Sequence, residues 1–215
     1  MLAKYGFNTG LRQAHFVGQA FEETGALTSA KEKGDAEYFR KMYENYTPSD
    51  AAYDFDNKYN WIKKLGYLKN RNRSEYIAKR PAEVHEKAVS RGNISPGDGA
   101  RFKGRGLIHL TWRDGYGDYA KFRARDFTTD PNPEKLESDA ETAADSAGYY
   151  WIKINIMKKA DRGRGDIDVK ECFKKVGGAG GLAERTLFFH YADFILGDSP
   201  DFPAELKLER QSEDI

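Results

Sequence analysis

The chain has 215 residues, of which 39% are hydrophobic, 13% aromatic and 32% charged. This composition supports a packed core and excludes a disordered tail. The 35 basic and 34 acidic residues leave a formal net charge of +1. Proteins that coat nucleic acids or bind membranes through basic segments need a broad field of one sign, so neither class of partner is expected.

Apolar residues recur at helical spacing through most of the chain, which predicts a mainly α-helical fold. Gly25 and Pro48 are interpreted as the stops of the first two helices, and Pro81 as a first-turn residue of the third. The predicted helices cover residues 11–23, 35–46, 81–91, 140–154, 169–176 and 182–196. Evidence for strands is limited to Leu107–Thr111, so at most a small β element is expected.

Hydropathy, the N-terminal residues and the cysteine and histidine content indicate where the protein is expected to be made and whether it binds a metal. No apolar run approaches the roughly 20 residues of a membrane span, and Met1–Gly6 does not open a secretory signal. We therefore expect synthesis in the cytoplasm without membrane insertion. The single cysteine, Cys172, excludes an internal disulfide and is predicted to be buried. None of the four histidines forms a zinc-binding H-E-x-x-H pair, so no metal is expected, and His15 and His190 are assigned to the core.

A glycine-rich segment, residues 97–116, is predicted to be non-helical because its glycines permit a tight backbone. It matches neither the phosphate-binding nor the dinucleotide-binding glycine motif. Trp112 and Tyr116, which lie beside short polar residues, suit a sugar cleft in which rings stack on aromatic side chains. The alternative is a loop with a purely structural role.

Two carboxylates near the N-terminus suggest acid–base chemistry. Glu23 and Glu32 are nine residues apart, and a chain break at Gly25 would let them face each other across a groove. Apolar neighbours predict a raised pKa and a protonated Glu23, whereas Lys31 and Lys33 favour an ionised Glu32. A glycosidase needs such a contrast. With 34 acidic residues in the chain, a pair at this spacing also arises by chance.

Two motifs resemble those of the family 19 glycoside hydrolases. Residues 14–25, AHFVGQAFEETG, resemble the signature A-H-F-x-x-Q-x-x-H-E-[ST]-G that carries the catalytic acid. Residues 97–116 resemble the second signature, G-D-G-x-x-[YF]-x-G-R-G-L-I-Q-L-T-x-x-x-N-Y. Shorter matches near residues 132–136, 146–151 and 176–185 follow in the same order, so the resemblance covers about residues 11–196. The chain is more similar to phage endolysins and bacterial lysozyme-like effectors than to plant chitinases, because it lacks the disulfides of the latter.

The resemblance implies a lysozyme-like, two-lobed α-helical fold for a single domain, residues 1–215, with no cofactor. It makes Glu23 the general acid and Glu32 the general base, and Thr111 matches the hydroxyl residue that helps to hold water or sugar. Tyr59 or Trp61, in a stretch that matches no family segment, could extend the cleft.

The chain departs from the family pattern at four positions. Glu22 replaces a histidine, His109 a glutamine, and Gly115 and Gly177 each replace an asparagine. His109 remains a substrate-binding candidate because of its place in the signature. The two lost amides leave a wider floor, which suits the lactyl ether and peptide stem of N-acetylmuramic acid (MurNAc) better than a chain of small sugars. Four basic residues could contact the carboxylates of the peptide stem: Lys31, Lys33, Lys103 and Arg105.

The sequence therefore predicts an inverting muramidase that cleaves β-1,4 links in the glycan strands of peptidoglycan. Such an enzyme would act on the cell wall in the periplasm or outside the cell after delivery by phage proteins or a secretion machine such as the type VI system. As an antibacterial effector it would imply an immunity protein. The alternatives are a chitinase that uses the same carboxylates and a non-catalytic glycan-binding or virion structural domain.

Overall fold

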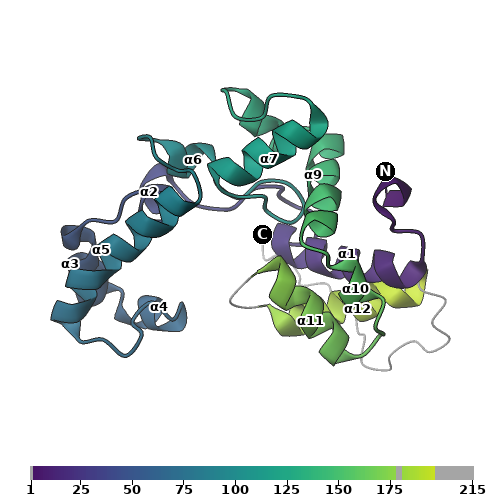
Figure 1. The fold of residues 1–215 in the computed structure, drawn as a ribbon. Coiled ribbons are helices and arrows are strands. Elements are labelled where there is room, and N and C mark those ends of the chain that lie inside the picture. Colours follow the sequence, from purple (N-terminus) through teal and green to yellow (C-terminus); the bar gives the residue numbers. More distant parts are fainter. Residues whose placement is uncertain (1, 178–180, 197–215) are drawn as a thin grey trace, which may run out of the picture. The chain divides into compact units, whose positions relative to one another are not determined.

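The computed structural model describes residues 2–177 and 181–196, and in this part the regular secondary structure is helical apart from isolated β-bridges (Figure 1). The predicted mainly α fold is confirmed. The helices are, in chain order, η1 (Leu2–Tyr5), α1 (Gly10–Thr24), α2 (Ala36–Tyr43), α3 (Pro48–Asn57), α4 (Tyr59–Lys64), α5 (Arg73–Ser90), α6 (Asp98–Arg101), α7 (Arg113–Arg123), η2 (Asn132–Glu134), α8 (Lys135–Ser138), α9 (Ala140–Lys153), α10 (Met157–Ala160), α11 (Asp166–Val176) and α12 (Leu182–Leu196).

The chain divides into two compact units, one made of residues 1–28 and 148–215 and the other of residues 29–147. We call them the terminal unit and the central unit. The prediction of a single lysozyme-like domain over residues 1–215 stays a prediction. No helix in the described ranges is long and apolar enough to cross a membrane.

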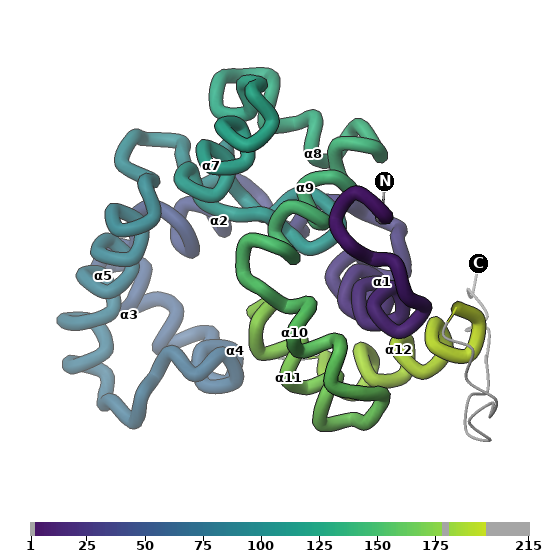
Figure 2. Tube along the Cα trace, turned by 45° about the vertical axis from the view of Figure 1, so that its right-hand side comes forward, coloured from purple at the N-terminus to yellow at the C-terminus, as the bar shows by residue number. Residues whose placement is uncertain are grey.

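The terminal unit is built on the packing of α1 against α12, which lie side by side in Figures 1 and 2. Gly25 ends α1 in the left-handed conformation, at φ 57°, as the sequence predicts for a helix stop. Ala14, Val169, Phe189 and Ala192 form a buried cluster. Gly18 lets the two helices approach closely, because a Cβ at this position would lie 2.9 Å from the backbone nitrogen of Phe189.

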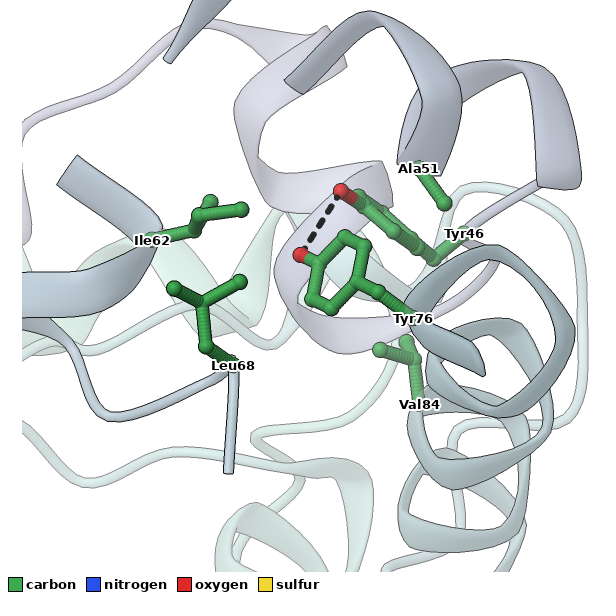
Figure 3. Packing of buried hydrophobic residues seen from close by; sticks show 6 residues of the cluster. All are labelled: Tyr46, Ala51, Ile62, Leu68, Tyr76 and Val84. Carbon is green, nitrogen blue, oxygen red and sulfur yellow. Dashed lines mark hydrogen bonds between the residues drawn. The ribbon is translucent and has the colours of Figure 1, made fainter. Parts of the chain in front are cut away.

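The central unit has its own core between α3, α4 and α5 (Figure 3). The hydroxyl groups of Tyr46 and Tyr76 are hydrogen-bonded at 3.2 Å in this core. The other members of the cluster are Ala51, Ile62, Leu68 and Val84. Residues 51–80, which match no family motif, therefore supply most of this core.

Two predicted helix boundaries are wrong because stronger capping signals lie elsewhere. The third predicted helix begins at Arg73 rather than Pro81, since Asn72 and Glu75 form a capping box, and Pro81 lies inside α5. The second ends at Tyr43, and Pro48 opens α3 instead of only stopping the chain, because Thr47 caps that helix.

The glycine-rich segment is partly helical, contrary to the prediction. It contains α6 and the start of α7, and Arg113 of α7 donates to the fully buried Asp98 of α6 at 2.5 and 3.1 Å. The predicted strand Leu107–Thr111 is wrong as well. Arg105 forms only isolated antiparallel bridges, with Lys31 and Leu110, because tight turns separate the paired residues.

The core assignments of single residues have mixed outcomes. Cys172 is fully buried as predicted, and burial raises the pKa of its thiol to about 12, so the thiol is unreactive at neutral pH. His15 is fully buried, and burial lowers its pKa. The assignment of His190 to the core is wrong, because its side chain is 31% exposed and contacts Asp166 at 3.0 Å.

We predict that Gly18→Ala destabilises the protein although alanine is the better helix former. The new Cβ would push against the backbone of α12, which cannot move aside as a flexible side chain would, so we expect a loss of about 1–3 kcal/mol in the free energy of unfolding. The matched control is Gly117→Ala in α7, where a Cβ would meet nothing within 4 Å and should stabilise the helix by up to about 1 kcal/mol. Urea unfolding followed by circular dichroism measures both. Equal effects of the two changes would contradict the close packing of α1 on α12.

Candidate functional site: two carboxylates in contrasting surroundings

Glu23 lies in the last turn of α1, in the terminal unit, where its carboxylate meets a buried arginine. Nη2 of Arg185, from α12, donates to Oε1 of Glu23 at 2.6 Å. The arginine side chain is only 4% exposed and that of Glu23 16%. A second guanidinium nitrogen of Arg185 donates to Oε1 of Gln19 at 2.8 Å, and the group lies over the ring of Phe173. The guanidinium is thus fixed from three sides and holds the carboxylate in place.

The sequence predicts apolar neighbours for Glu23, and the structure adds a buried cation to them. An adjacent guanidinium favours the ionised form of a carboxyl group and opposes the protonation expected of a general acid. The pKa of the neighbouring Glu22 is raised, because burial outweighs the attraction of Arg185. Sequence reasoning matched Arg185 to the last family motif but did not place it at Glu23, 162 residues away. It also assigned no perturbed pKa to Glu22, which stands where the family has a histidine.

Glu32 lies in the central unit, in the segment before α2, and its carboxylate is held by neutral donors. The hydroxyl of Tyr43 lies 2.8 and 2.9 Å from its two oxygens. The hydroxyl of Tyr38 donates to Oε1 at 3.4 Å, and the backbone N–H of Gly104 donates to Oε2 at 3.2 Å. Because the two tyrosines are on α2, this helix fixes the carboxylate from one side and the glycine-rich segment fixes it from the other.

Both tyrosines stay protonated at neutral pH and so remain donors. Burial, reinforced by the negative charge of Glu32, raises the pKa of Tyr38 to about 12 and that of Tyr43 further. The expected role of Lys31 beside Glu32 is wrong, because its ammonium group lies 3.7 Å from Glu137 instead. Hydroxyl groups and a backbone amide, and not the flanking lysine, surround the Glu32 carboxylate.

Three of the other predicted site residues lie close to this arrangement. The ring of Trp112 packs edge-on against that of Tyr43, with centroids 4.9 Å apart. His109 adjoins Gly104, where a Cβ would lie 2.9 Å from the Cβ of His109. The hydroxyl of Thr111 donates to the carbonyl oxygen of His109 at 2.8 Å. All three side chains are half-buried, so the second signature does gather around Glu32.

Tyr116 and Arg105 are wrong as direct substrate contacts because both are buried. Tyr116 is 0% exposed and its hydroxyl donates to the carbonyl oxygen of Lys103 at 2.7 Å. Arg105 is 5% exposed and donates to Glu137 at 2.9 Å and to the hydroxyl of Tyr116 at 3.1 Å. These two residues instead form an internal polar frame that supports the glycine-rich segment.

The two carboxylates belong to different units, and each is described within its own unit. Their expected position across one groove stays a prediction. In the described ranges, no group of three or more His, Cys, Asp or Glu residues is arranged to hold a metal ion.

We predict that Arg185→Met lowers the free energy of unfolding by about 2–4 kcal/mol, because it leaves a largely buried carboxylate without its cation. Adding Glu23→Gln to this variant should recover part of the loss, since the unpaired charge is then gone. Lys175→Met, at an exposed position of α11, is the control for loss of a positive charge. Urea unfolding of the wild type, the single variants Arg185→Met and Glu23→Gln and the double variant gives the coupling energy, and additive single effects would mean that the pair does not stabilise the unit.

No family model matches the chain. A protein of Haemophilus influenzae (strain Rd), named as a glycosyl hydrolase family 19 domain-containing protein, is similar to it, with 26% identity over 172 residues that cover 75% of this chain and 74% of the relative. Its name agrees with the resemblance of the two signatures. The similarity thus supports a glycosidase of the family 19 type, the family of chitinases and lysozyme-like enzymes.

Proposed function

We propose that the protein is a muramidase that cleaves the β-1,4 link between MurNAc and N-acetylglucosamine (GlcNAc) in peptidoglycan. The observation that carries the proposal is the contrast between two carboxylates, Glu23 within the first signature and Glu32 in contact with the second. Glu23 is bound by the guanidinium of Arg185, whereas Glu32 is bound by tyrosine hydroxyls and a backbone amide. Two carboxyl groups in different surroundings can take the separate roles of acid and base.

Glu23 is proposed as the acid that protonates the glycosidic oxygen. Its partner Arg185 contacts Oε1, and a protonated carboxyl group can keep one oxygen as an acceptor while the other carries the proton. The acid would therefore hold its proton on Oε2, with Arg185 still bound to Oε1. Arg185 is then a positioning residue that fixes the direction of the proton.

Glu32 is proposed as the base that activates water. The hydroxyl of Tyr43 has a single proton that its two contacts share, and the Tyr38 contact at 3.4 Å is long. One acceptor position on the carboxylate therefore remains for a water molecule. Attack of this water on the sugar face opposite the leaving group gives inversion, for which the two carboxyl groups would be about 6.5–9.5 Å apart.

The lost amides favour peptidoglycan over chitin as the substrate. A Cβ at Gly115 would meet Leu110 at 3.4 Å, an ordinary contact, so packing does not require a glycine there. Glycine instead leaves space beside the second signature, which the lactyl ether and peptide stem of MurNAc need. A chitinase would gain from an amide that grips each N-acetyl group.

Delivery and partners follow from the same proposal. An enzyme made in the cytoplasm that acts on the cell wall must be released by phage proteins or exported by a secretion machine such as the type VI system. If it serves as an antibacterial effector, an immunity protein would protect the producing cell. The relation to endolysins and effectors belongs to this proposal.

We predict that Glu23→Gln and Glu32→Gln each abolish clearing of purified cell walls while the helical circular dichroism is kept. General acid–base catalysis contributes roughly 10²–10⁴-fold, so each loss should exceed tenfold. Glu37→Gln is the control, because Glu37 is exposed and pairs with Arg40. If Glu32→Gln clears walls normally and Glu37→Gln does not, the base has been misassigned. A wild type that binds walls without clearing them would favour the glycan-binding alternative.

We predict that digestion of purified sacculi releases muropeptides that end in reducing MurNAc, with little release from colloidal chitin. Borohydride reduction marks the reducing end, and mass spectrometry then identifies it. Reduced MurNAc ends support a muramidase. Reduced GlcNAc ends, or faster cleavage of chitin, would overturn the assignment of substrate.

A further inference from the structure

The central unit contains a cavity of about 530 Å³ that the proposed catalytic roles do not use. Its lining comes from α2, from the segment 54–67 that contains α4, and from α5. Tyr46 and Tyr76, the hydrogen-bonded pair in Figure 3, lie in its wall, so the cavity adjoins the core of the unit. Half of this lining belongs to residues 51–80, which match no family motif.

Arg80 is the cation of this cavity whose charge is least compensated. Its guanidinium stacks on the ring of Tyr67, 3.9 Å from the centroid, and its side chain is only 13% exposed. The nearest carboxylate, Glu83, is 3.9 Å away and is already bound by Arg71 at 2.6 Å and by Lys69 at 2.8 Å. These two hydrogen bonds hold the pKa of Glu83 at about 2. Both of these hydrogen bonds are made to Oε1 of Glu83, whereas Arg80 faces Oε2 from beyond hydrogen-bonding distance.

The hydrogen bonding of the Arg80 guanidinium is also incomplete. Its buried Nε has no hydrogen-bond acceptor among the described residues. A flat guanidinium held against an aromatic ring is oriented in advance for a carboxylate, which it can bind through two parallel hydrogen bonds. The geometry at Arg80 thus fits an anionic ligand better than a neutral one.

The other charged groups of the cavity do not supply that anion. The buried Asp54 lies 3.8 Å from the ammonium of Lys41 and 3.5 Å from that of Lys58, and accepts from Tyr46 at 2.8 Å. Glu37 is exposed and is bound by Arg40 at 2.6 and 2.8 Å. The third lining carboxylate, Asp35, accepts from the backbone N–H of Tyr38 at 2.7 Å. None of the three lining carboxylates is paired with Arg80, so its guanidinium is the group left for an anion from the ligand.

The remaining wall is aromatic and reaches the candidate base. Trp61, 38% exposed, packs edge-on against Tyr67, and Met42 adds a flexible apolar surface. Tyr38 lines the cavity and also donates to Glu32. A ligand here would thus be a carboxylate on a partly apolar body, located next to the carboxylate that is proposed to activate water.

We propose that this cavity binds the carboxylate-bearing peptide stem of peptidoglycan, with Arg80 taking a stem carboxylate and Trp61 and Tyr67 packing on its side chains. The inference rests on the proposed function, because it assumes that the glycan passes Glu32. A MurNAc residue at Glu32 would place its lactyl-linked peptide beside Tyr38, at the cavity. A bare GlcNAc chain has no carboxylate and would leave Arg80 without an anion.

Calorimetric binding to the intact chain tests this assignment with three soluble probes. They are the stem tripeptide L-Ala–γ-D-Glu–diamino acid, the same peptide with its carboxylates converted to amides, and a GlcNAc oligomer. We expect the tripeptide to bind and Arg80→Gln to weaken its binding tenfold or more, since a charge-assisted pair is lost. The amidated peptide should bind the wild type as weakly as the tripeptide binds the variant.

Lys79→Gln is the matched control, because Lys79 is the exposed neighbour of Arg80 on α5 and loses the same charge. It should bind the tripeptide like the wild type. Trp61→Ala, at a partly exposed position, tests the aromatic wall without touching the core and should also weaken binding. Equal binding by Arg80→Gln and Lys79→Gln, or displacement of the tripeptide by the GlcNAc oligomer, would overturn the proposal.

The binding assay separates this inference from the proposed catalytic function because it needs no hydrolysis. If the protein binds the tripeptide through Arg80 but does not clear walls, the assignment of the cavity stands and the proposed muramidase activity is rejected. If the protein clears walls but does not bind the tripeptide, the proposed muramidase activity stands and the assignment of the cavity is rejected. In an active enzyme, Arg80→Gln should also reduce the preference for peptide-bearing strands over strands stripped of peptides.

Discussion

The reciprocal hydrogen bonds between Glu32 and Gly104 determine the arrangement of the candidate base. The backbone N–H of Glu32 donates to the carbonyl oxygen of Gly104 at 2.9 Å, and the N–H of Gly104 donates back to the Glu32 carboxylate at 3.2 Å. A side chain at 104 would collide with His109. The glycine is therefore required by close approach, and through it the second signature and the candidate base have a fixed geometry. Because Tyr43 contacts both Glu32 and Trp112, the aromatic surface is fixed relative to the same carboxylate.

In the terminal unit, the buried charge of Arg185 has to be compensated. Arg185 is too deeply buried to keep its hydration, so it needs acceptors in the protein, and Glu23 and Gln19 supply them. Both acceptors lie on α1, one helical turn apart, and both fall within the first signature. The motif thus encodes a cradle for a guanidinium as well as a carboxyl group. Chemistry at Glu23 is constrained by this ion pair, since Oε1 already accepts a hydrogen bond from Arg185.

Local sequence patterns predicted the parts of this protein that depend on local forces. The ends of α1 follow from Gly25 and its apolar spacing, and the wide apolar face of α9 follows from its alanines. The start of α5 also has a local signal, the capping box of Asn72 and Glu75. The start was nevertheless predicted at Pro81, because proline is frequent in the first turn of a helix. The second signature identified the segment around Glu32, yet it did not distinguish Trp112, which is half-buried beside Tyr43, from Tyr116, which is fully buried.

The surroundings of the two carboxylates depend on contacts that no local pattern contains. Arg185 reaches Glu23 across 162 residues, and Gly104 reaches Glu32 across 72. Tyr38 and Tyr43 were visible in a predicted helix, but their direction toward Glu32 depends on the path of residues 29–35, which backbone hydrogen bonds to residues 104 and 106 fix. Charge neighbours in the sequence were misleading for the same reason, since Lys31 turns away to Glu137.

Helix α2 links the candidate base to the cavity beside it, and this connection has a mechanical consequence. Tyr38 presents its ring to the cavity and its hydroxyl to Glu32, at 3.4 Å, the longest of the contacts that hold the carboxylate. A ligand that contacts Tyr38 would bear on this contact, whereas Tyr43 and Gly104 already hold the carboxylate at 2.8–3.2 Å. Occupation of the cavity would then act on the base through one hydrogen bond. In a muramidase, the peptide stem would thereby contribute to the orientation of the group that activates water, and a substrate without a stem would lack this contribution.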